Sequence, residues 1–247
     1  MNIENGVAIC KLCLKPAQLK QSHIIPSSLH KILKDEGKNV RFVLPGTLTV
    51  KNQTDLKELM LCNDCEQEFS KFEKKTIELL RPLWKSTKSG KFSYTVPASS
   101  TNMILRFVHS VFWRASASTM LSKYKLDVAI EESLRTSILH NESLNPPLLP
   151  IRLDFFTYLQ KFDSQNIMQS PGMYEMYPGY MHSAFVTLGI IFTMISPKSS
   201  DIVDLSPYVS AGAPYTISAG PIFVQAPCIA AVNEIQKLAV DYAKSKP

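Results

Sequence analysis

Four cysteines form two pairs that could share one metal ion. Cys10 and Cys13 make one CxxC pair, and Cys62 and Cys65 make the other. Two cysteines at this spacing can aim both sulfurs at one point, and Zn²⁺ favours four such thiolates in a tetrahedron. In a reducing compartment, paired cysteines indicate metal rather than disulfides. The spacing therefore predicts one structural Cys₄ zinc site, whose loss would unfold the module around it.

A candidate for proton transfer lies between the two pairs, in the hexapeptide QSHIIP that contains His23. A histidine followed by two branched apolar residues and a proline is predicted to end a strand just before a turn. Histidine can serve as a base near neutral pH, but an isolated one is often only a structural or exposed residue. These residues alone leave both interpretations open.

Short elements must position the cysteines and His23. A helix is expected from Pro26 to Gly37, because proline suits a first turn and glycine suits a stop. Residues 39–50 predict two short strands around a Pro-Gly turn. The second cysteine pair is followed by a helical pattern that runs to Trp84. The polar residues 85–100 are expected to form a boundary.

The second half of the chain predicts both helices and strands. Its expected elements are helices at 101–124, 128–139 and 226–243, and strands at 183–196 and 215–225. Trp113 is expected in the core. Arg114 is expected either to pair inside the protein or to reach toward a phosphate. The fifth cysteine, Cys228, and the histidines His109, His140 and His182 have no companion motif, so structural or surface roles are expected for them.

The positive charge is confined to the cysteine-bearing part of the chain. Residues 1–91 carry 16 Lys and Arg against 10 Asp and Glu, whereas residues 92–247 carry 11 of each. A basic module can attract nucleic acid, although a lysine-rich solvated surface gives the same count. The longest apolar run, at 183–196, is too short to span a bilayer, and the N-terminus has no signal-peptide pattern. A cytoplasmic protein with no membrane partner is expected.

The order of these motifs resembles the zinc-containing branch of the HNH (ββα-metal, His-Me finger) nucleases. The corresponding stretches are Cys10–Cys13, Ser22–Pro26 and Leu61–Glu66. The chain also resembles a set of bacterial proteins of unknown role that share the motifs SHIIP, LCxxCE..FSxxE and S-x-x-W-R. The second of these motifs lies here at Leu61–Glu73 and the third at Ser110–Arg114. The resemblance covers about residues 8–80 and, loosely, the region around Trp113.

The resemblance implies a treble-clef or ββα-metal zinc module over residues 1–91. The residue pattern of 92–247 predicts a mainly helical α+β region of unassigned role, so the chain as a whole is expected to be α+β. In that family the matching histidine, here His23, is a general base for phosphodiester hydrolysis. Glu66 stands where the family usually has a metal-binding histidine. Ser22 and Glu73 are further candidates for the shell of a catalytic Mg²⁺ or Mn²⁺. The basic residues that could contact phosphate are Lys20, Arg41, Lys71 and Lys74.

Three functions remain open at this point. The first is a metal-dependent nuclease acting on DNA or RNA. The second is a non-catalytic zinc module that binds nucleic acid. The third is a protein-interaction scaffold, in which residues 92–247 form a homodimer or bind a regulatory partner. A Gly-rich phosphate loop, a dinucleotide fingerprint and a serine-nucleophile elbow are not found in the sequence.

Overall fold

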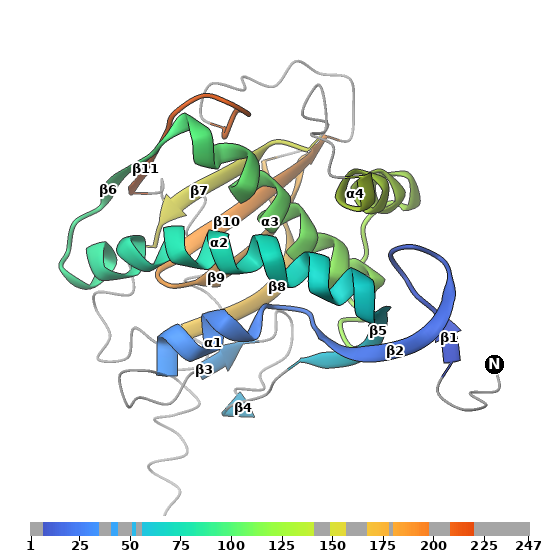
Figure 1. The fold of residues 1–247 in the computed structure, drawn as a ribbon. Coiled ribbons are helices and arrows are strands. Elements are labelled where there is room, and N and C mark those ends of the chain that lie inside the picture. Colours follow the sequence, from blue (N-terminus) through green and yellow to red (C-terminus); the bar gives the residue numbers. More distant parts are fainter. Residues whose placement is uncertain are drawn as a thin grey trace, which may run out of the picture.

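A computed structural model describes most of the chain and has a mixed α+β architecture (Figure 1). The described residues are 7–34, 41–43, 51–52, 56–140, 149–156, 167–177, 180–197 and 208–219. Within them the chain forms four helices and two sheets. None of the helices in these ranges is long and apolar enough to cross a membrane.

A small antiparallel sheet carries the two cysteine pairs. Its strands are β1 (Val7–Ile9), β2 (Pro16–His23) and β5 (Lys57–Cys62), in the order β1-β2-β5. A register shift between Lys20 and Gln21 interrupts the β2–β5 pairing. Helix α2 (Asn63–Lys88) begins where β5 ends, and the acidic residues Asp64 and Glu66 in its first turn suit the helix dipole.

The helix expected after Pro26 is confirmed as α1 (Ser27–Lys34). Its buried residues Leu29, Ile32 and Leu33 recur at helical spacing and pack into the core. Of the two short strands expected within 39–50, residues 41–43 form β3 (Arg41–Val43), which pairs with β4 (Lys51–Asn52). Residues 44–50 and Gly37 lie outside the described ranges.

A larger mixed sheet forms the centre of the molecule, with the order β4-β3-β8-β9-β10-β7-β11-β6. Its strands from the second half are β6 (Ser93–Val96), β7 (Ile151–Phe155), β8 (Ile167–Tyr177), β9 (Tyr180–Thr187), β10 (Ile190–Pro197) and β11 (Tyr215–Ala219). The described part of residues 92–247 is therefore a mixture of helices and strands with slightly more strand than helix, not mainly helical as expected, because its short apolar segments pair with one another as strands.

The apolar run at 183–196, expected as one strand, is a hairpin of β9 and β10. Leu188 and Gly189 form its turn with φ values of 54° and 69°. Positive φ at both central residues is the geometry of a tight hairpin turn, and glycine favours it. The glycine was the local signal for this turn. The run was too uniformly apolar for its hydrophobic pattern to mark the break.

Helices α3 (Ala98–Ala117) and α4 (Val128–His140) confirm that this part of the chain has two helices, but the first ends at Ala117 and not at residue 124 as expected. Helix α3 packs against α2 and against the large sheet, as Figure 1 shows. Its residues 107–116 are all buried, and Trp113 is 1% exposed, so the expectation of a core tryptophan is confirmed.

Residues 85–100 were expected to be a boundary. They contain the end of α2, a turn with Gly90 at φ 73°, strand β6 and the start of α3. The division of the chain near residue 91 stays a prediction. The helix expected at 226–243, residues 220–225 of the expected last strand, and Cys228 lie outside the described ranges.

Candidate functional site

The four cysteines lie together at one end of the small sheet. Their sulfur atoms are all within 4.8 Å of one another, and the Sγ atoms of Cys13 and Cys62 are 3.9 Å apart. A tetrahedral zinc site with Zn–S bonds of about 2.3 Å places its sulfurs about 3.8 Å apart. The cluster therefore has the ligand set and nearly the spacing that Zn²⁺ requires, and it could hold this ion.

Backbone hydrogen bonds shape the first cysteine turn and attach it to β5. The Leu14 amide donates to the Cys10 carbonyl at 2.9 Å, and Leu14 adopts φ 59°. The Cys62 amide donates to the Cys10 sulfur at 3.3 Å, and the Lys11 amide donates to the Met60 carbonyl at 3.0 Å. A left-handed leucine is strained by roughly 1 kcal/mol. The turn holds this conformation because it must aim both sulfurs at one point.

The electrostatics of the cluster favour a cation. Burial raises the pKa of the Cys65 thiol, and the nearby sulfurs of Cys62, Cys10 and Cys13 raise it further. Four thiolates at this separation would repel one another, and a divalent cation reverses that repulsion. The first cysteine turn is also held by α4, because the Arg135 guanidinium donates to the Leu12 carbonyl at 2.6 Å.

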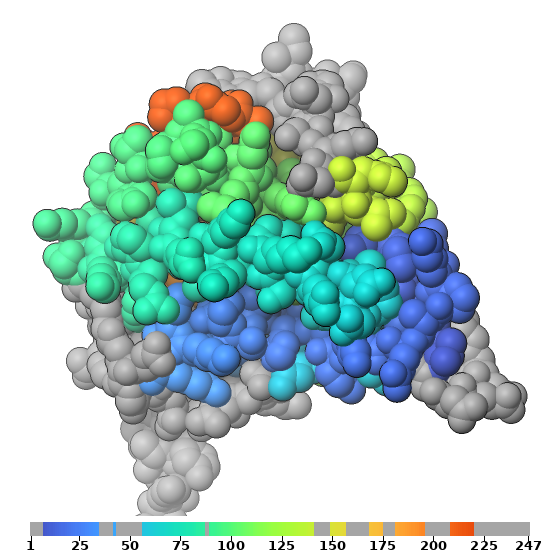
Figure 2. Space-filling view, in the orientation of Figure 1, coloured from blue at the N-terminus to red at the C-terminus, as the bar shows by residue number. Residues whose placement is uncertain are grey.

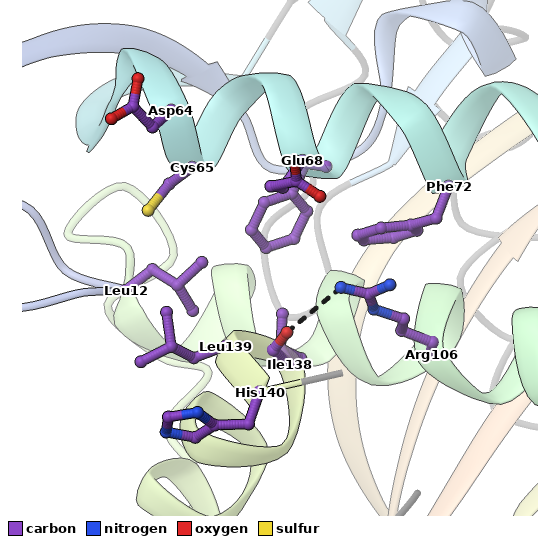
Figure 3. Close-up of a pocket in the computed structure, with 10 residues that line it drawn as sticks. Leu12, Asp64, Cys65, Glu68, Phe72, Arg106, Ile138, Leu139 and His140 are labelled. Atoms are coloured by element: carbon purple, nitrogen blue, oxygen red, sulfur yellow. Dashed lines mark hydrogen bonds between the residues drawn. The ribbon is translucent and has the colours of Figure 1, made fainter. Parts of the chain in front are cut away.

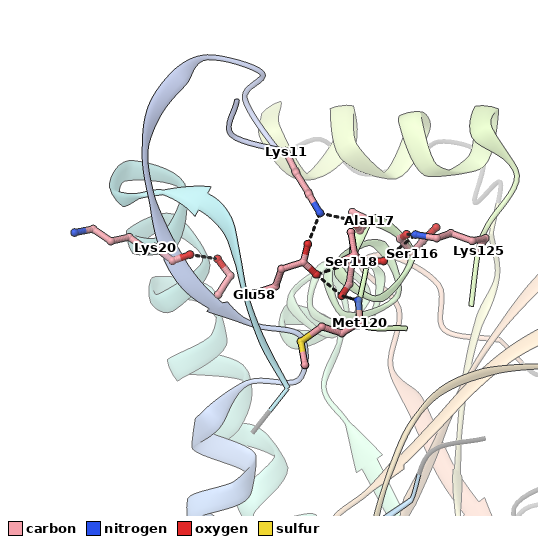
Figure 4. Close-up of polar contacts among 10 residues, drawn as sticks. Lys11, Lys20, Glu58, Ser116, Ala117, Ser118, Met120 and Lys125 are labelled. Atoms are coloured by element: carbon pink, nitrogen blue, oxygen red, sulfur yellow. Dashed lines mark hydrogen bonds and ion pairs between the residues drawn. The ribbon is translucent and has the colours of Figure 1, made fainter. Parts of the chain in front are cut away.

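A polar network joins the first cysteine turn to the end of α3 (Figure 4). Lys11 Nζ contacts Glu58 Oε1 at 2.6 Å and donates to the Ala117 carbonyl at 2.7 Å. Glu58 Oε2 accepts from the Ser118 hydroxyl at 2.6 Å and from the Thr119 amide at 2.8 Å. Burial raises the pKa of Glu58, but these contacts lower it by more, so the net shift is downward. These contacts therefore fix the first cysteine turn to the body of the molecule.

His23 ends β2 and lies at a second cluster, in which Arg114 is the central residue. Arg114 Nη1 donates to the His23 carbonyl at 2.9 Å, and Arg114 Nη2 forms an ion pair of 2.6 Å with Glu73 Oε1. The Arg114 side chain is 2% exposed and that of Glu73 is 15% exposed. Of the two roles expected for Arg114, the structure has the internal pair.

Aromatic rings pack against this cluster. The Arg114 guanidinium carbon lies 4.8 Å from the centre of the Phe69 ring, and Phe69 stacks against Trp113 at 6.3 Å. The three motifs with which the chain resembles the bacterial proteins are thus in contact: His23 from the first, Phe69 and Glu73 from the second, and Trp113 and Arg114 from the third.

Two carboxylates of α2 lie near each other beside this cluster. Burial raises the pKa of Glu73, Arg114 lowers it and the charge of Glu66 raises it, with a net upward shift. Glu66 Oε1 is buried and has no hydrogen-bond partner among the described residues. Ser22 is fully buried, and its hydroxyl donates to the Lys20 carbonyl at 3.4 Å.

Outside the cysteine cluster, the described residues offer no second set of three or more gathered metal ligands. Within the described ranges, the cysteines are the only set of three or more His, Cys, Asp or Glu whose ligand atoms gather within 4.8 Å. His23, Glu66 and Glu73 therefore do not form a closed three-ligand set, and Glu73 is already paired. Glu66 Oε1 is left without a hydrogen-bond partner among the described residues.

The basic residues expected to contact phosphate are spread over several elements. Lys20 is exposed on β2, and Lys71 and Lys74 are exposed on α2, where Lys71 forms an ion pair with Glu68. The surface of α2 runs across one face of the molecule, between the N-terminal elements and α3 (Figure 2). Arg41 lies in β3, but its side chain is not among those described.

The remaining histidines differ in their surroundings. His109 is buried, its Nε2 lies 3.2 Å from the Leu149 carbonyl, and burial lowers its pKa to about 4, so it is neutral and structural. His182 is also buried, and His140 is exposed at the end of α4.

Comparisons with protein-family models, with curated proteins and with solved structures give no match for this chain.

Proposed function

We propose that the chain is a metal-dependent nuclease of the HNH kind, with His23 as its general base. The observation that carries the proposal is the position of His23 at the end of β2, where its carbonyl accepts a hydrogen bond from Arg114, which is also paired with Glu73 of α2. The order of two antiparallel strands and a helix, β2, β5 and α2, with a cysteine pair before β2 and another at the start of α2, supports a ββα-metal module.

In this proposal each residue has a separate task. The half-buried His23 accepts a proton from water, and Arg114 fixes the backbone that presents the imidazole. Glu66 would hold the Mg²⁺ or Mn²⁺, which supplies charge stabilisation for the phosphate. Glu73 holds Arg114 in place. The exposed lysines Lys20 and Lys74 attract the phosphate backbone.

A second candidate is a zinc-stabilised module that binds nucleic acid without cutting it. The observation that favours it is the engagement of Glu73 by Arg114, together with the lack of a closed three-ligand set around Glu66 in the described ranges. Such a module would bind through charge, so its affinity would fall steeply as salt rises.

Cleavage of single- and double-stranded DNA and RNA, with Mg²⁺, with Mn²⁺ and with EDTA, separates the two candidates. We expect metal-dependent cutting that falls at least about 100-fold in His23→Ala, because a general base contributes that much or more. His140→Ala is the matched histidine control, since His140 is exposed at the end of α4, outside the β2, β5 and α2 elements of the candidate site, and lines the pocket described below. Both variants are checked for bound zinc.

Full activity in a zinc-loaded His23→Ala variant would refute the assignment of the base. Salt-sensitive binding by a folded, zinc-loaded wild type that cuts none of the substrates would favour the second candidate.

A further inference from the structure

A pocket opens between α2, α3, α4 and the first cysteine turn, with Cys65 of the cysteine cluster and Phe69 of the His23 cluster in its wall (Figure 3). Its volume is about 350 Å³, which lies within the range of small-molecule sites. Its walls are mainly apolar. The apolar side chains that line it are Leu12, Phe69, Phe72, Ile138 and Leu139.

Arg106 of α3 brings a positive charge into this apolar wall. Its Nη2 donates to the Ile138 carbonyl at 3.3 Å, and its guanidinium carbon lies 4.5 Å from the centre of the Phe72 ring. Its Nε–H is buried and has no hydrogen-bond partner among the described residues. A guanidinium has five N–H donors, and the one on Nε of Arg106 is left for a ligand in the pocket.

Burial of Arg106 is not balanced by an ion pair in the part of the chain that the structure describes. Burial lowers the pKa of its guanidinium, while the charge of Glu68 acts in the opposite direction. Glu68 is itself paired with Lys71, and Asp64 lies at the other end of the pocket from Arg106 (Figure 3). Arg106 is partly buried, and a partly buried guanidinium in an apolar wall attracts an anion that reaches it from the pocket.

We propose that this pocket binds a small monocarboxylate with an apolar body. The carboxylate pairs with Arg106 and takes up its unused N–H groups. The apolar body fills the space between Phe69 and Leu139, where contact removes apolar surface from water. Because Asp64 and Glu68 line the same pocket, a ligand with a second negative charge is disfavoured.

Three probes with the same aromatic body test the proposal: phenylpropionate, its neutral amide phenylpropionamide, and the dianion phenylsuccinate. Binding to the full-length, zinc-loaded protein is measured by calorimetry and by ligand-observed NMR. We expect phenylpropionate to bind at least about tenfold more tightly than the amide, because a hydrogen bond to a charged group contributes that much. Phenylsuccinate should bind more weakly than phenylpropionate.

Two variants of the pocket locate the site. Arg106→Gln should lower the affinity for phenylpropionate to that of the amide, whereas Arg81→Gln, at an exposed position of α2, should leave it unchanged. Leu139→Trp should fill the pocket and abolish binding, which keeps the test decisive if Arg106→Gln does not fold. Equal affinities for the acid and the amide, no binding of phenylpropionate to folded wild type, or full binding in Leu139→Trp would each overturn the proposal.

Discussion

Replacing Arg114 with methionine should destabilise the protein by about 3 kcal/mol near neutral pH. Removing one partner of a buried ion pair typically costs 3–5 kcal/mol because the other charge is left without compensation. The lower end of that range applies here because Glu73 keeps 15% of its side chain exposed. Methionine preserves most of the apolar contact with Phe69, so the loss reports mainly on charge and on the hydrogen bond to His23.

The size of this effect should depend on pH. The folded-state pKa of Glu73 is raised, so its contribution to stability is fully present below its unfolded pKa and is lost as pH rises through the folded value. Arg114 lowers the folded-state pKa of Glu73, so this pKa rises further in the Arg114→Met variant. In the variant, the loss of stability with rising pH therefore continues to a higher pH than in the wild type. The difference between variant and wild type should therefore be smallest below the unfolded pKa of Glu73, near 4.5, and largest at alkaline pH. Each pKa unit of further upward shift corresponds to about 1.4 kcal/mol.

Urea unfolding of the zinc-loaded protein, followed by tryptophan fluorescence at several pH values, measures both quantities. Lys71→Met is the matched control, because the Lys71–Glu68 pair is exposed and such a pair contributes less than about 1 kcal/mol. The double variant Arg114→Met/Glu73→Gln should lose the extra pH dependence. A loss below about 1 kcal/mol that does not change with pH would refute the reasoning, because the carboxylate would then not be buried against the guanidinium.

Three further outcomes are expected. Elemental analysis should find one zinc ion per chain, and Cys62→Ser or a strong chelator should unfold the small sheet, seen as lost CD signal, because metal binding contributes directly to folding. Leu14→Gly should raise the stability of the zinc-loaded protein by up to about 1 kcal/mol in urea unfolding, because glycine adopts positive φ without strain. Glu58 has a lowered pKa, so its stabilising contribution is present above its unfolded pKa, near 4.5, and is lost as pH falls through the folded value. Glu58→Gln should remove that part of the acid sensitivity in a pH series of thermal melts.

The gathering of the four cysteines could be predicted from sequence because each pair is marked by its own local spacing. Each cysteine pair occupies one turn, and a shared metal is the simplest reason for two such turns. The strand that ends at His23 and the helix after Cys65 were likewise signalled by neighbouring residues. The hairpin turn at Leu188 was missed because the residues on both sides of it are uniformly apolar.

The polar contacts around the candidate site could not be predicted, because they join residues far apart in the chain. Glu58 meets Lys11 across 47 positions and Ser118 across 60, and Arg114 meets His23 across 91. The residues next to a single lysine, glutamate or serine do not indicate which distant residue it will contact. The pocket at Arg106 has the same origin, since its walls come from three helices and the first cysteine turn.

The path of the chain between the two cysteine pairs links the metal to the larger sheet. The chain leaves the small sheet after His23 and rejoins it at Leu56, where the Ile24 amide donates to the Leu56 carbonyl at 3.0 Å. In between, β3 enters the other sheet and pairs in parallel with β8. Bound metal would thus close the base of a loop whose far end is a strand of the large sheet. Hydrogen exchange of β8 amides should therefore accelerate together with that of β2 when the metal is removed, so the two sheets would open as one cooperative unit.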